Sequence, residues 1–237
     1  MALDEETRAR LSGVSTATLT TCLFKRGFRN VFLQDVHPVA PGGPRMVGEA
    51  FTLRLIPARE DLDTMAVYAD PDHPQRKAIE TCPAGHVLVI DSRGDPRAAS
   101  AGDILIARLK ARGVAGIVTD GGFRDVAGIA RLGFPAYHRR PSAPPGVVFH
   151  HAADFGLPIG CGGVAVYPGD VMVGDEDGVV CIPAHLAAEV AAEAVETTLY
   201  EEFVEERVRA GDPLPGLYPA SEASRAAFAL WRNSRGR

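Results

Sequence analysis

The stretch of residues 86–137 constrains the fold most strongly, because short apolar runs alternate there with longer amphipathic ones. The apolar runs predict buried strands, and the amphipathic runs, each followed by glycine, predict helices. The predicted elements are strand 86–91, helix 102–112, strand 114–119, helix 123–132 and strand 134–137. This alternation predicts a parallel sheet whose strands are joined by right-handed helical crossovers.

Three charged side chains fall near the starts of these two helices. Asp103 lies in the first turn of one, and Arg124 and Asp125 lie near the start of the next. Both helices begin near the carboxyl ends of strands, where open α/β sheets bind ligands. First-turn amides and an arginine suit a bound carboxylate, and aspartate oxygens are ligands that Mg²⁺ prefers. Spacing alone also fits ordinary helix capping, so both interpretations stay open at this point.

The spacing of an Asp, twenty residues and then Arg-Asp resembles the signature of the RraA-like family. This family includes class II 4-hydroxy-4-methyl-2-oxoglutarate aldolases and regulators of ribonuclease E activity. The glycine frame of the signature is also matched, at Gly113, Gly116, Asp120 and Gly121. Residues 159–183 resemble the family's Pro-Gly-Asp and Asp-Gly-Val-Val segment. The resemblance extends over about residues 10–205.

The resemblance implies an α/β fold of the swivelling β/β/α kind, with a parallel βαβαβ core and a long C-terminal helix. It also implies a homotrimer or homohexamer whose sites lie at subunit interfaces and include an acidic residue from a neighbouring subunit. The candidates for that residue are Glu196, Glu201 and Glu202. We expect residues 1–237 to form one domain, with a tail of about 212–237 that contacts another subunit.

As to activity, the resemblance implies a divalent-metal-dependent lyase that cleaves a C–C bond of a 2-oxo acid to give pyruvate enolate. The reaction would be that of a 4-hydroxy-4-methyl-2-oxoglutarate aldolase, an oxaloacetate decarboxylase, or both. Arg124 and Asp103 would be catalytic, and Asp125 would bind the metal, Mg²⁺ or Mn²⁺. The implied substrate-binding residues are Gly102, Ile104, Leu105 and Arg124.

Two other functions remain open. One is a non-catalytic regulator that binds a ribonuclease, although the intact Asp103, Arg124 and Asp125 set favours an enzyme over a purely binding role. The other is a lyase or dehydratase of a sugar-derived 2-keto acid. Many family members carry a Ser-Asp or similar acidic pair in the N-terminal helical region, where this chain has Thr20-Thr21-Cys22. That departure leaves a different substrate possible.

Composition argues against several other classes of protein. A net charge of −5 does not fit a nucleic-acid binder, and no apolar run approaches the length of a membrane span. The polar, acidic start does not fit a signal peptide, so we expect a cytoplasmic protein. The four cysteines have no metal-binding spacing and are expected to fill the core, and the adjacent His150 and His151 are expected to be structural.

The rest of the chain reads as further helices and strands. A polar loop is expected at 92–101, where Arg93 and Arg97 either contact a second carboxylate or a phosphate, or are ordinary surface residues. The other predictions are one or two helices in 4–28 with a break near 12–13, a strand at 46–57, strands at 163–166, 171–173 and 179–182, a helix at 184–210 and a helical turn at 226–231.

Overall fold

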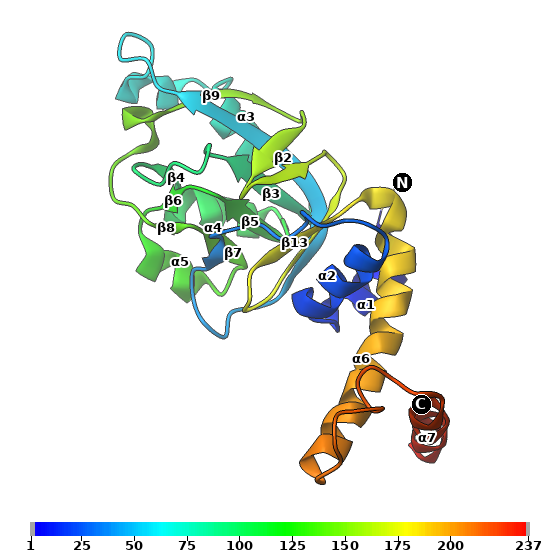
Figure 1. Ribbon diagram of the computed structural model, residues 1–237. Helices are drawn as coiled ribbons and strands as arrows, with labels where there is room; N and C mark the ends of the chain where they lie inside the picture. The colour runs from blue at the N-terminus through cyan, green and yellow to red at the C-terminus, as the bar shows by residue number, and fades with distance from the viewer. Residues whose placement is uncertain (1–2, 236–237) are drawn as a thin grey trace.

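An eight-stranded sheet lies at the centre of the protein (Figure 1), in a computed structural model that describes residues 3–235. Seven strands follow the order β1-β7-β5-β3-β2-β12-β13, and β9 pairs with the second half of the long strand β2. The strands are β1 (His37–Pro38), β2 (Met46–Pro57), β3 (His86–Asp91), β5 (Gly116–Thr119), β7 (Ala136–His138), β9 (His150–Phe155), β12 (Val171–Gly174) and β13 (Val179–Ile182).

Strands β3, β5 and β7 form the parallel core that the sequence predicts, and β2 extends it by pairing parallel to β3. Leu88 of β3 pairs with Phe51 on one side and with Ile117 on the other. All four residues of β5 and the four central residues of β3 are buried, which explains why both read as continuous apolar runs. The α/β fold class with a parallel core is therefore confirmed.

A second parallel sheet of three very short strands lies beside the first. It consists of β4 (Ala99–Ala101), β6 (Gly122–Phe123) and β8 (Arg140–Pro141). Two expectations are wrong here. Part of the expected polar loop at 92–101 is a buried strand, and the helix expected from residue 123 begins only at Val126. Phe123 is fully buried and its carbonyl accepts a hydrogen bond from Ser142 N (2.9 Å), so it belongs to the sheet.

Helices cover the main sheet in two groups (Figure 1). Helices α3, α4 and α5 pack on the parallel strands around Ile106, Leu109 and Phe123. Helices α1 and α2 pack against α6 and the β12–β13 hairpin. The bounds are α1 (Glu5–Ser12), α2 (Thr16–Lys25), α3 (Pro74–Thr81), α4 (Asp103–Ala111), α5 (Val126–Leu132), α6 (Ala187–Arg209) and α7 (Glu222–Ser234).

Two features lie where the local sequence predicts them: the break between α1 and α2, and the strands of the hairpin region. Ser15 caps α2 by accepting a hydrogen bond from Thr18 N (3.0 Å), so the predicted break is confirmed. The predicted strands in 163–182 are also confirmed, as β11 (Val164–Val166), β12 and β13. A fourth strand, β10 (Ile159–Cys161), was not expected; it pairs with β11 across Gly162 and Gly163, which both have positive φ angles.

The second half of α6 and helix α7 project from the body, and we call residues 200–235 the C-terminal arm (Figure 1). Its own small core joins Phe203, Val204 and Leu217 to the rings of Tyr200, Phe228 and Trp231. The helix expected at 184–210 is confirmed apart from a first turn of 3₁₀ helix, and α7 is longer than the helical turn expected at 226–231. Within residues 3–235, no helix has both the length and the apolar character needed to cross a bilayer.

Candidate active site

A cleft of about 280 Å³ opens where the N-terminus of α4 meets the connection between β6 and α5. The 3₁₀ helix η1 (Met65–Ala69), the start of α3 and residues 145–146 complete its walls. The six residues predicted for the site all line this cleft: Gly102, Asp103, Ile104, Leu105, Arg124 and Asp125. The predicted spacing therefore does bring these residues together, although Arg124 and Asp125 precede α5 instead of lying inside it.

Gly102 allows the side chain of Arg124 to cross the start of α4. A Cβ atom on Gly102 would lie 2.9 Å from Cγ of Arg124 and 3.1 Å from Oδ2 of Asp125, so any other residue here would displace the Arg124 side chain. The backbone supports the same approach, because Arg124 N donates to the carbonyl of Ala101 (3.1 Å). The observed position of Arg124 thus depends on glycine at residue 102.

Arg124 and Asp125 form a half-exposed pair at the mouth of the cleft. Arg124 Nε donates to Asp125 Oδ2 (3.1 Å), and the two side chains are 47% and 44% exposed. Asp125 has a left-handed backbone (φ 58°), which Asp tolerates better than most residues, and its carbonyl accepts from Gly128 N and Ile129 N at the start of α5. Among residues 3–235, no acceptor is bonded to the terminal nitrogens of Arg124. These two nitrogens can therefore donate a pair of parallel hydrogen bonds to a planar anion.

Asp103 and the first-turn amides of α4 also line the cleft. The Asp103 carboxylate lies against Gly128 of α5 and, within the described chain, has no hydrogen-bond or ion-pair partner. Gly102 is the N-cap of α4 and has no side chain to bond the amides of Asp103, Ile104 and Leu105. These N–H groups carry the positive end of the helix dipole and can bind an anion.

A network of buried polar side chains connects the end of β3 with β4 and β5. The hydroxyl groups of Ser92, Ser100 and Thr119 lie 2.7 to 3.0 Å from one another. Asp120, which is 5% exposed, accepts from the backbone N–H groups of Ser92 and Gly94. Burial raises the pKa of Asp120, and these N–H bonds oppose the increase. The network ties the end of β3 to β4 and so positions the start of α4.

Arg93 and Arg97 do not line the cleft, so the structure offers no support for their binding a second carboxylate there. Arg97 pairs with Asp95 (2.7 Å) and stacks on the ring of Phe149. The Arg97 guanidinium holds the pKa of Asp95 down at about 2. Arg93 reaches Nδ1 of His150 (3.1 Å). Both arginines are engaged in local structure.

The cleft is also lined by Tyr68, Gln75 and Arg76, which were not predicted as site residues. Gln75 is buried, and its Nε2 donates to the carbonyl of Ser100 (2.6 Å), which ties α3 to β4. The guanidinium of Arg76 lies over the ring of Tyr68, 4.8 Å from its centroid. No local pattern marks these residues, because the packing of η1 and α3 against the body brings them to the site.

The metal-binding potential of the site rests on two carboxylates. Asp103 and Asp125 line the same cleft, and they also share a second, more open hollow of about 520 Å³ beside α5. Within residues 3–235, no three His, Cys, Asp or Glu side chains are grouped as a ready-made metal cage. Mg²⁺ is usually bound by one or two carboxylates and several waters, so the donor set fits Mg²⁺ and does not fit a zinc site.

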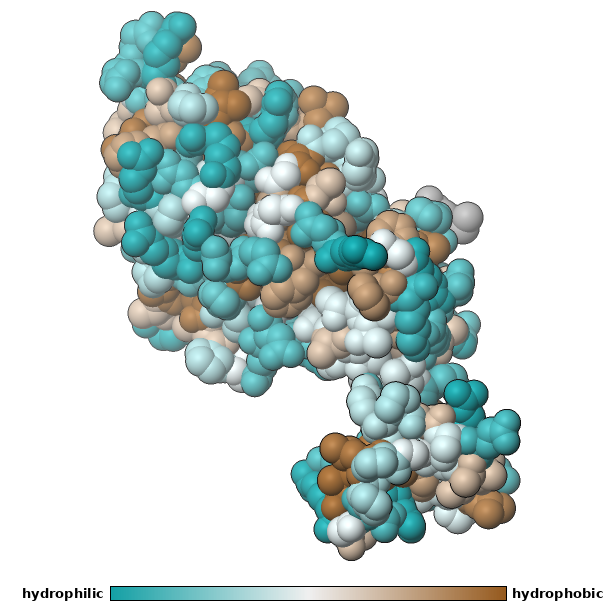
Figure 2. Space-filling model, viewed as in Figure 1, coloured by the Kyte–Doolittle hydropathy of each residue, from teal (hydrophilic) through white to brown (hydrophobic). Residues whose placement is uncertain are grey.

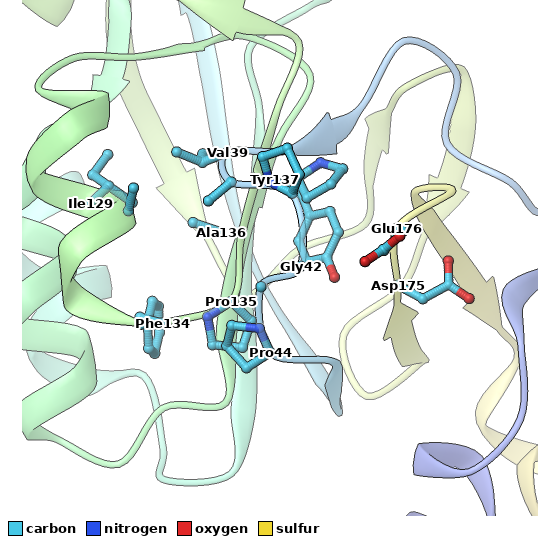
Figure 3. A pocket seen from close by; sticks show the side chains of 16 residues that line it. Val39, Gly42, Pro44, Ile129, Phe134, Pro135, Ala136, Tyr137, Asp175 and Glu176 are labelled. Atoms are coloured by element: carbon cyan, nitrogen blue, oxygen red, sulfur yellow. The ribbon is translucent and has the colours of Figure 1, made fainter.

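A separate cavity of about 230 Å³ lies between residues 38–44 and the end of α5 (Figure 3). Its walls are mainly proline and aliphatic side chains, with Tyr137 facing Asp175 and Glu176 at one end. Asp175 is already engaged, since it accepts from the backbone N–H and the hydroxyl of Thr16. No cationic side chain of the described residues lines this cavity, so the cleft at Arg124 is the better candidate.

Comparison with known proteins identifies the family. Residues 16–181 match the family model described as RraA-like, Aldolase/RraA. The chain belongs to the RraA-like family. The RraA-like chain is 40% identical over 111 residues to a Halalkalibacterium halodurans protein named as a candidate 4-hydroxy-4-methyl-2-oxoglutarate aldolase. The match covers 45% of this chain and spans half of that relative's length.

Two solved structures share the RraA-like fold over nearly the whole chain. An uncharacterized protein of Pseudomonas syringae has a TM-score of 0.81 at 25% identity and covers 93% of this chain and 96% of its own. Streptomyces coelicolor RraAS2, described as an unusual member of the RNase ES inhibitor RraA protein family, has a TM-score of 0.75 at 30% identity. That match covers 86% of this chain and 98% of RraAS2.

Proposed function

We propose that this chain is a divalent-metal-dependent lyase that cleaves a C–C bond of a 2-oxo acid and releases pyruvate. The observation that carries the proposal is the meeting of Arg124, Asp103 and Asp125 with the first-turn amides of α4 in one cleft. The name of the Halalkalibacterium relative, a candidate aldolase of a 2-oxo acid, supports the same kind of reaction.

The 2-oxo acid end of the substrate would bind between Arg124 and α4. The terminal nitrogens of Arg124 suit the carboxylate or the keto oxygen, and the amides of Ile104 and Leu105 would bind the remaining oxygen. Asp125 is the residue that would hold Mg²⁺ or Mn²⁺, with Asp103 acting directly or through water. When bound, the metal would supply positive charge that stabilises the enolate form of pyruvate.

The protein's own groups can complete bond cleavage. In a 4-hydroxy-4-methyl-2-oxoglutarate type of substrate, the C3–C4 bond breaks, its electron pair stays with C3, and the 4-hydroxyl loses its proton. Asp103, which has no partner in the described chain, would receive that proton through an ordered water. Oxaloacetate loses CO₂ instead and needs no such base. Arg124 would stabilise the developing enolate in both reactions.

We further propose a trimer or hexamer in which a neighbouring subunit completes the site. The C-terminal arm exposes several large apolar side chains, namely Leu214, Tyr218 and Leu230 (Figure 2). Of the three candidate acids, Glu196 pairs with Arg232 and Glu201 accepts from Thr18 in their own chain. Glu202 lies on the same helix. Size-exclusion chromatography with light scattering on the full chain and on residues 1–211 tests whether the part of the arm that follows α6 is needed for assembly.

The alternative function is a non-catalytic regulator of a ribonuclease, which the description of RraAS2 favours. The decisive experiment measures pyruvate release from oxaloacetate and from 4-hydroxy-4-methyl-2-oxoglutarate through lactate dehydrogenase. It is run with Mg²⁺ or Mn²⁺, with EDTA, and with Arg124→Ala. Metal-dependent release that the variant loses supports the lyase. Release from neither substrate by a folded, metal-supplied protein would contradict it, and metal-independent inhibition of a ribonuclease would then support the regulator.

A further inference from the structure

The cleft contains a second guanidinium group, that of Arg76, which the proposed chemistry does not use. Arg76 lies in the first turn of α3, is half-buried, and shares the cleft with Arg124. No carboxylate within residues 3–235 lies within ion-pair distance of it, and its contact is the ring of Tyr68. By contrast, its neighbour Lys77 pairs with Asp72 (3.0 Å).

Arg76 is held in place relative to the predicted catalytic residues. The hydrogen bond from Gln75 Nε2 to the carbonyl of Ser100 ties the start of α3 to β4, and β4 leads directly into Gly102 and Asp103. Stacking on Tyr68 restricts the guanidinium itself. Burial raises the pKa of Tyr68, and the charges of Arg76 and Arg124 both oppose that increase, so both cations lie within electrostatic range of this ring.

The two guanidinium groups of the cleft have different surroundings. Arg124 lies beside Asp125 and the start of α4, where a metal-bound 2-oxo acid would bind. Arg76 has no paired anion among the described residues, and a half-buried guanidinium favours a carboxylate. The cleft volume of about 280 Å³ lies just below the range for pockets that bind drug-sized ligands, roughly 300–1,000 Å³, which suits a short diacid.

We infer that Arg76 binds the second carboxylate of a dicarboxylic 2-oxo acid and selects it over a monocarboxylic one. This inference rests on the proposed function, since it assigns the second end of the same substrate. Arg76 touches no reacting bond, so it acts on specificity. Its loss raises the KM for a diacid far more than it changes kcat.

Binding of two non-cleavable ligands of equal chain length tests this inference directly. Isothermal titration calorimetry with Mg²⁺ compares 2-oxoglutarate, which has the second carboxylate, with 2-oxopentanoate, which lacks it. We expect the wild-type protein to bind 2-oxoglutarate at least about tenfold more tightly, in line with a hydrogen bond to a charged group. Arg76→Gln should remove that advantage and leave the Kd of 2-oxopentanoate unchanged.

The control variant is Lys77→Gln, which removes a cation from the same helix but outside the cleft and should preserve the tenfold preference. Unchanged binding of 2-oxopentanoate shows that Arg76→Gln is folded. A preference for 2-oxoglutarate that survives in Arg76→Gln overturns the inference and leaves the proposed function intact. Failure of the wild-type protein to bind either ligand overturns both.

Discussion

The carboxylate of Asp103 lies against the Cα of Gly128, so closely that a Cβ atom on Gly128 would be 2.5 Å from Oδ2 of Asp103. The contact joins the first turn of α4 to α5, and it holds the acid beside Arg124 and Asp125. Gly128 lies outside the pattern of residues that the sequence signature uses. Its lack of a side chain nevertheless determines where Asp103 points.

Replacing Gly128 by alanine should therefore reduce activity without unfolding the protein. The new methyl group would displace Asp103, and we expect a loss of pyruvate release of about tenfold to a hundredfold, typical of a misplaced catalytic group. Alanine also favours a helix, so the melting temperature should change little. Gly160→Ala is the matched control, because nothing lies within 4 Å of a Cβ there. Equal activity in the two variants would contradict the role given to Asp103.

The guanidinium of Arg124 should be needed for its shape as well as its charge. We expect Arg124→Ala to lose about a hundredfold or more in kcat, the scale of a transition-state charge donor. Arg124→Lys retains the charge but cannot bind an anion with two parallel N–H groups, so it should recover only part of that loss. Steady-state kinetics of both variants measures the difference. Full activity of Arg124→Lys would show that charge alone suffices.

The four cysteines should be unreactive in the folded protein. Cys22, Cys82, Cys161 and Cys181 are all buried and reduced. Burial raises the pKa of Cys82 to about 12, so at pH 8 roughly one thiol in ten thousand there is ionised. A colorimetric thiol reagent should label none of the four within minutes, and all four after denaturation. Rapid labelling of even one native thiol would show that its segment opens.

Acid should destabilise the protein through His138. Burial lowers the pKa of His138 to about 4, and its ring packs on Phe123. Between pH 6.5 and 4 the unfolded chain binds a proton at this site that the folded chain does not, so stability decreases as the pH falls through that window. His138→Phe preserves the stacking and removes the titration. Its melting temperature should therefore drop less between pH 7.5 and 4.5 than that of the wild type.

Local sequence pattern was sufficient for the elements that are long enough to show a clear apolar pattern. Strands β2 and β3 have the predicted ends, because one alternates and the other is a continuous apolar run. Strands β4, β6 and β8 have only two or three residues each, and their pairing depends on contacts between distant segments. A strand of two or three residues is too short to show an alternating pattern of apolar and polar residues. Phe123 was therefore predicted to begin a helix, although it belongs to a sheet.

The residues of the candidate site also fall into those that a sequence pattern predicts and those that depend on contacts between distant segments. Asp103, Arg124 and Asp125 were found through a spacing along the chain, and the structure places them in one cleft. Arg76 was missed because the Gln75–Ser100 hydrogen bond, which no sequence pattern encodes, brings α3 to the cleft. Arg97 was a candidate ligand contact because it follows the end of a strand. Asp95, two residues earlier, instead holds it in a local ion pair.

The C-terminal arm also contains the only tryptophan of the chain, Trp231. Its indole packs on the ring of Phe228, 5.9 Å between centroids, and donates to Glu206 (3.0 Å), whereas the aromatic residue of the cleft is Tyr68. Indole emission responds to the polarity around the ring, so the intrinsic fluorescence of this protein reports on the arm and barely on the cleft. Docking of one arm onto another molecule can thus be followed optically, without a label and independently of whether a substrate is bound.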